Sequence, residues 1–200
     1  MANHRKTETS AKLKKFYSTM SNAVKLAETE NGLESWEWKN IGNNCYGSNQ
    51  INTFENYLAK HIIYTTIGNA SEILDFSVVD KLNTYGYALG SDPVVYLNDG
   101  SYFIIAECDN SILYDVNGEK DPNDLGRDIF PFSILWRDIN KNYPHFYPTV
   151  YSTSHPDGSL ELGSYTREEA IQQCKTNRML CSYLLQLDGW EFKDDYPLRL

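Results

Sequence analysis

One long amphipathic stretch near the amino terminus constrains the fold of this 200-residue chain more than any other feature. Between Lys6 and Gly32, apolar residues recur at the spacing that places them on one face of an α-helix. That face consists of Leu13, Phe16, Tyr17, Met20, Val24 and Ala27. Thr7 or Thr9 can cap its start, and Asn31-Gly32 can end it in the left-handed conformation. The pattern predicts a helix about 36 Å long that packs on a core.

The remaining elements predict an α+β fold with an antiparallel sheet. Apolar runs between Asp92 and Gly118 are broken at Asn98-Asp99-Gly100 and at Asp109-Asn110, as expected of a meander. We expect a second helix at 51–62, a further strand at 129–136, and a helix at 167–176 behind a Thr166–Glu169 capping box. Residues 181–187 fit a helix or a strand equally well, and 184–200 alternate as an extended closing strand would.

Charge divides the chain into a stem, 1–32, and a head, 33–200. The net charge is -9; residues 1–31 hold six Lys or Arg against three Glu, which is +3 and leaves -12 for the rest. An acidic head does not favour nucleic acid as a partner. The four cysteines form no CxxC pair, and their even number fits either disulfides in an oxidising compartment or buried free thiols.

The segment DVNGEKDPN, 115–123, has two interpretations. Asp115, Asn117, Glu119 and Asp121, followed by Asn123, place oxygen atoms at alternate positions, as calcium ligands often are. Lys120 and Gly126 stand where an EF-hand loop would carry Gly and Glu, so the motif is half a calcium loop. The other interpretation is a tight turn built on Asn117-Gly118 and Pro122, with no cofactor.

No motif indicates an enzyme. The histidines lack metal-site spacing, and neither a GxSxG elbow nor a phosphate-binding glycine loop is present. Asp121, Asp124 and Asp128 are the nearest candidates for acid–base chemistry, although such a cluster is typical of a solvated turn. His145 and His155 lie among Tyr143, Tyr147 and Tyr151, which fits either a sugar-stacking surface or ordinary packing.

Three blocks of sequence, in order, resemble bacterial prepilin-type proteins, the type IV pilin-like subunits and type II secretion pseudopilins. The blocks are the stem 3–32, the central DVNGEKDPNDLGRDIFPF at 115–132, and the tail LLQLDGWEFKDDYPLRL at 184–200. The family carries a short leader with a cleavage site, an N-terminal methylation signal and an apolar half-helix of about 20 residues, which this sequence lacks. We expect the sequence to begin just after that membrane segment; a natural soluble paralogue is the alternative.

The resemblance implies a pilin-like fold, with a long N-terminal helix on an antiparallel sheet. It implies a non-enzymatic, membrane-anchored, extracytoplasmic subunit of a secretion pseudopilus or pilus. Its partners would be other pilin-like subunits and inner-membrane assembly machinery, with Leu13, Phe16, Tyr17, Met20 and Val24 in the assembly stem. A minor pilin or adhesin that binds a ligand through the loop 140–163 is the alternative.

The resemblance also bears on the cysteines and on the calcium motif. It implies a disulfide loop between Cys174 and Cys181 and leaves Cys45 to pair with Cys108, whereas the spacing alone leaves all three pairings open. Some pilin-like proteins hold calcium near this end of the sheet, which adds some weight to the metal interpretation of Asp115 and its neighbours, but the tight turn stays the preferred interpretation.

Overall fold

The computed structural model describes residues 2–38, 49–87, 89–106, 111–135, 143–150, 152–154 and 160–200. The helices are α1 (Ala2–Asn31), α2 (Asn49–Thr53), α3 (Ala70–Ile73), α4 (Phe76–Thr84), α5 (Arg167–Asn177) and α6 (Cys181–Leu187). Short helical turns follow as η1 (Ser35–Glu37), η2 (Phe54–Leu58) and η3 (Ala59–His61). None of the helices in these ranges is both long and apolar enough to cross a bilayer.

The main sheet has six antiparallel strands, and its spatial order is the order of the chain. They are β1 (Tyr64–Asn69), β2 (Pro93–Leu97), β3 (Tyr102–Ala106), β4 (Ser111–Asp115), β5 (Ile129–Ile134) and β6 (Phe146–Pro148). A separate hairpin pairs β7 (Ser152–Ser154) with β8 (Leu160–Leu162). Each strand pairs with its predecessor in the chain, which is the simplest antiparallel topology. The β2–β3 connection is a short turn, whereas the β1–β2 connection carries α3 and α4.

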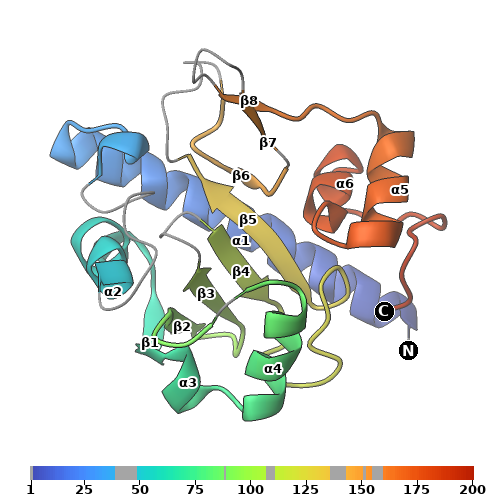
Figure 1. The fold of residues 1–200 in the computed structure, drawn as a ribbon, viewed down its shortest axis with the longest axis horizontal. Coiled ribbons are helices and arrows are strands. Elements are labelled where there is room, and N and C mark those ends of the chain that lie inside the picture. Colours follow the sequence, from blue (N-terminus) through green and yellow to red (C-terminus); the bar gives the residue numbers. More distant parts are fainter. Residues whose placement is uncertain are drawn as a thin grey trace.

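Helix α1 crosses one face of this sheet and runs the length of the molecule (Figure 1). Its stripe is buried: Leu13 and Met20 have no exposed surface, and Val24 and Ala27 have almost none. The ring of Phe16 stacks on Tyr114 of β4 with centroids 3.8 Å apart and lies 5.5 Å from the ring of Phe132 of β5. The apolar stripe therefore fastens the helix to the middle of the sheet.

The opposite face of the sheet is covered by α3 and α4, which supply Ala70, Val78 and Leu82. Successive side chains of a strand point to opposite faces of the sheet, so each strand contributes to both hydrophobic layers. Phe103 of β3 packs on the α1 side, and Ile104 packs on the α4 side. Because both faces are covered, β3, β4 and β5 are buried at every position. Their sequences consequently read as continuous apolar runs.

The α+β class, the long N-terminal helix and the antiparallel meander predicted from the sequence are confirmed. The helix at 51–62 is a succession of α2, η2 and η3, and its last residue, Ile62, is extended. Helix α5 begins with both bonds of the predicted capping box between Thr166 and Glu169. Residues 181–187 form a helix, α6.

The predicted closing strand at the carboxyl end is wrong. Residues 188–200 contain no strand, because Gly189 and Trp190 have φ of +67° and +66°, which turns the chain sharply after α6. The large side chains still dock as expected: Trp190 packs on Tyr17 and Phe132, and Tyr196 is buried. The alternation of apolar and charged residues in this segment therefore reflects which side chains face the core within a series of turns, without a strand.

Replacing Phe16 by Ala should lower the free energy of unfolding by about 3 to 5 kcal/mol, because it leaves a cavity inside the aromatic cluster. Urea denaturation followed by circular dichroism measures this. Ser18→Ala, at an exposed position of the same helix, should be nearly neutral. Equal stability of the two variants would show that the helix is not held through this ring.

Candidate functional site

The exposed face of α1 lies opposite its buried stripe. Lys14, Ser18, Asn22 and Lys25 are exposed, and Leu26 is 49% exposed. The predicted stem residues Leu13, Phe16, Met20 and Val24 are buried within the molecule, while Tyr17 is partly buried between Phe132 and Trp190. Surfaces available to a partner on this helix therefore belong to the polar face.

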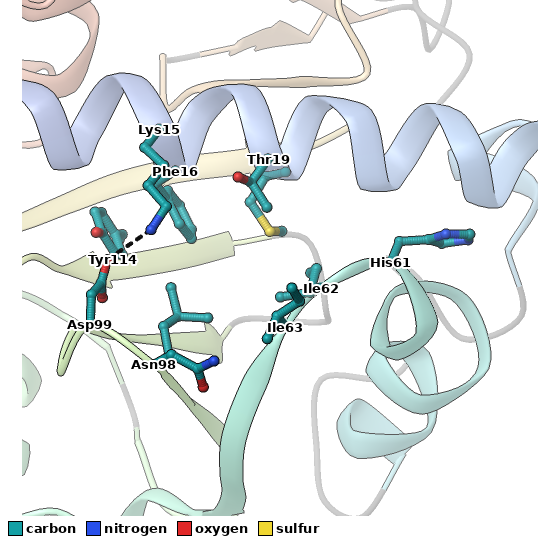
Figure 2. A pocket seen from close by; sticks show the side chains of 11 residues that line it. Lys15, Phe16, Thr19, His61, Ile62, Ile63, Asn98, Asp99 and Tyr114 are labelled. Atoms are coloured by element: carbon teal, nitrogen blue, oxygen red, sulfur yellow. Dashed lines mark hydrogen bonds and ion pairs between the residues drawn. The ribbon is translucent and has the colours of Figure 1, made fainter.

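A cavity of about 280 Å³ lies beside α1, between the helix, the β2–β3 turn and the segment before β1 (Figure 2). Lys15 and Asp99 face each other across its rim, with Nζ and Oδ2 3.4 Å apart. Ile62 and Ile63 line the opposite side, and Ile63 is 78% exposed. The lining also includes His61, whose Nε2 lies 3.7 Å from Oε2 of Glu30. Most of the remaining lining is apolar, as in a packing groove.

The loop 116–128 between β4 and β5 is the most polar buried part of the described chain. Asp128 is fully buried, and its carboxylate accepts the amides of Asn123 and Asp124 at 3.0 and 2.7 Å. Asp115, equally buried, accepts the amide of Asn117 at 2.9 Å. Gly118, with φ of +72°, has no room for a side chain, since a Cβ would lie 2.6 Å from the carbonyl oxygen of Gly100. The structure therefore contains the tight turn predicted at Asn117-Gly118.

Three buried oxygen atoms in or beside this loop have no hydrogen-bond partner: Oδ2 of Asp115, at the end of β4, and the Oδ1 atoms of Asn117 and Asn123. The hydroxyl of Tyr102 has no partner at hydrogen-bond distance either, but it lies close enough to Asp115 to lower the pKa of that carboxyl. Burial raises the pKa of Asp115 to about 8, and the nearby Asp128 carboxylate also raises it. Arg5 of α1 approaches Asp128 at 3.8 Å, too far for a hydrogen bond. Buried acceptors without donors are costly, and a hard cation is one means of satisfying them.

The structure brings together only half of the four predicted calcium ligands. Glu119 is exposed and accepts the hydroxyl of Tyr96 at 2.6 Å and the amide of Asp75 at 2.9 Å. Asp121 is exposed as well. Asp115 and Asn117 instead lie beside Asp128, whose Oδ2 is 3.4 Å from Nδ2 of Asn117. Buried Asp128 is therefore a better candidate ligand than either exposed carboxylate.

Two of the three carboxylates considered for acid–base chemistry, Asp124 and Asp128, are occupied by structural bonds. Asp124 accepts Tyr85 at 2.9 Å and forms ion pairs with Lys81, Arg127 and Arg178. Burial acts to raise its pKa, but the bonds from Lys81 and Tyr85 and the charge of Lys81 hold the pKa below its usual value. An anion held by so many donors is a poor proton acceptor, so the enzyme interpretation gains no support from this loop.

The carboxyl-terminal region clamps the same loop. A disulfide joins Cys174 and Cys181, and a Cβ on Gly126 would lie 2.5 Å from the sulfur of Cys181. The hydroxyl of Tyr196 donates to the carbonyl of Gly126 at 2.5 Å, and Nε of Arg127 donates to that of Arg199 at 2.7 Å. Cys45 and Cys108 lie outside the described residues.

The aromatic loop 140–163 is described only at 143–150, 152–154 and 160–163. Tyr147, on β6, is buried against Leu135 and Leu162, so its ring packs in a small third core and is not a stacking platform. Tyr143 packs partly against this core. His145 faces Glu28 and Glu34, a contact that the sequence analysis missed. Tyr151 and His155 lie outside the described residues.

Comparison with known proteins identifies a family. The model described as "Family of unknown function (DUF6613)" matches residues 1–200, so the chain belongs to this family. No curated protein and no solved structure matches the chain.

Calcium should raise the thermal midpoint of the protein, and a chelator should lower it again, because a bound cation satisfies oxygens that the apo loop leaves unpartnered. Differential scanning calorimetry measures both. Asp115→Asn should remove the response, whereas Asp121→Asn, at an exposed position of the same loop, should keep it. A midpoint indifferent to calcium in the unaltered protein would leave the loop as a polar turn only.

Proposed function

We propose that this member of the DUF6613 family is a non-enzymatic, pilin-like subunit of a bacterial filament, such as a type II secretion pseudopilus or a type IV pilus. Its globular part would be extracytoplasmic and held at the membrane by the full-length chain. The observation that carries this proposal is helix α1, 30 residues that lie across an antiparallel meander with one face buried and the other exposed.

The three sequence blocks that resemble prepilin-type proteins meet in space. Arg5, from the first block, faces Asp128 in the second at 3.8 Å. Lys12 donates to the carbonyl of Val116 at 2.7 Å. Tyr196 and Arg199, in the third, bond to Gly126 and Arg127. Segments that are far apart in the chain are therefore adjacent in the fold.

Charge favours contact between copies of the chain. The stem carries +3 and the remainder -12, and Lys14 and Lys25 are exposed on the face of α1 that does not touch the sheet. A cationic helix on one subunit can therefore meet the acidic head of the next, a head-to-tail contact that builds a helical filament when it does not close into a ring.

The disulfide between Cys174 and Cys181 supports an extracytoplasmic location. Such bonds persist mainly in oxidising compartments, including the periplasm and cell surface. It also holds α6 against α5, so that the tail stays on the loop 116–128.

The double substitution Lys14→Glu and Lys25→Glu should leave the fold intact and reduce the amount of protein in filaments, because it removes the attraction between stem and head. The variant and the parent are produced in the source bacterium, filaments are sheared from the cells, and the subunit is quantified in each fraction. Circular dichroism of the purified variant checks its fold. Lys175→Glu, exposed on α5, provides a comparison on another surface with half the change in charge, and it should assemble normally.

Mass spectrometry of the N-terminal peptide from native cells should reveal an apolar segment of about 20 residues ahead of Ala2, with a methylated first residue. Parent protein that carries no such segment and is recovered only as a monomer would overturn the proposal.

A further inference from the structure

A second cluster of metal-ligating side chains lies at the opposite end of α1 from the loop 116–128. Glu28, Glu34 and His145 place one donor atom each within 4.8 Å of one another. Nδ1 of His145 is 2.5 Å from Oε1 of Glu28 and 3.5 Å from Oε2 of Glu34. The side chains of Glu28 and His145 are only 14% and 21% exposed. The cluster is therefore partly shielded from water.

Three separate elements hold these donors in place. Glu28 lies in the last turns of α1 and accepts the amide of Ser35 at 2.8 Å, which orients its carboxylate. Glu34 is the residue before η1, and its own amide donates to Glu37. His145 precedes β6; its carbonyl accepts the amide of Leu135, and its ring packs edge-on against Trp36, 5.0 Å away.

The arrangement is more than a histidine ion pair. A single ring nitrogen carries at most one proton and can donate it to one carboxylate, yet two carboxylates converge on it. Within the part of the chain that the structure describes, neither Glu28 nor Glu34 pairs with a Lys or Arg. Two carboxylates therefore converge on one ring nitrogen, and a divalent cation would neutralise their combined negative charge.

We propose that Glu28, Glu34 and His145 bind one zinc ion, or a similar divalent transition metal. Imidazole nitrogen with carboxylate oxygen is a donor set that zinc accepts and that calcium and magnesium do not favour. Three protein ligands leave a fourth position for water. An open hollow lined by Lys25, Glu28 and Glu34 gives the ion access from solvent.

Binding at this position would join the end of α1 to the β5–β6 connection, two segments more than 100 residues apart in sequence. The hydroxyl of Ser35 already donates to the carbonyl of Leu135 at 2.8 Å between the same segments. The metal would therefore reinforce an existing junction. This site shares no ligand with the loop 116–128 and does not depend on filament assembly.

Isothermal titration calorimetry of tag-free, chelator-treated protein with zinc chloride tests the proposal. We expect one zinc ion per chain. Glu34→Gln should weaken binding about tenfold or more, and His145→Gln should abolish it. Glu72→Gln, at an exposed glutamate on α3, and Asp115→Asn, at the end of β4, should bind as the parent does.

Cobalt provides a second readout, because a bound Co²⁺ ion with a nitrogen ligand gives a visible absorption spectrum that the His145→Gln variant should lack. If that variant fails to fold, Glu34→Gln decides the matter, since the side chain of Glu34 is half exposed and its loss should not disturb the core. No zinc binding by the parent, or equal affinity in the parent and Glu34→Gln, would overturn the proposal.

Discussion

The packing of α1 on the sheet is the interaction on which the rest of the structure depends. Phe16 lies among Tyr114, Phe103 and Phe132, rings supplied by β4, β3 and β5, so that one side chain contacts three strands. Burying this stripe removes a long apolar surface from water, which is the main favourable term in folding. It also fixes where each end of the helix lies, and both candidate metal sites are located at those ends.

Elements with strong local signals could be predicted from the sequence. The stripe of α1, the Thr166–Glu169 capping box and the breaks between β2, β3 and β4 each depend on residues within a few positions of one another. The tail was mispredicted because alternation normally marks a strand, and the positive φ of Trp190 is rare for a residue other than glycine. Trp190, Phe192 and Tyr196 pack against the same core from a series of turns, which gives an alternating sequence without a strand.

The candidate metal sites could be identified only from the three-dimensional arrangement of residues that are far apart in the sequence. Sequence spacing selected Asp115 and Asn117, which lie close to Asp128 in the fold. It also selected Glu119, whose carboxylate instead bonds to Tyr96 and Asp75 on other parts of the fold. The pairing of His145 with Glu28 could not be foreseen, since 117 positions separate them and neither lies in a motif. Local spacing identifies ligands within one loop, whereas ligands shared between elements appear only once the topology is known.

The buried contacts that follow α1 along most of its length have a mechanical consequence. Its contacts run from Thr9 to Ala27 along a single axis, and nearly every turn in that range buries a residue. A pull along the helix axis would load these contacts together in shear, so they would have to break at once. A pull across the axis would peel them apart one turn at a time. The molecule should therefore resist tension along α1 far better than tension at right angles to it.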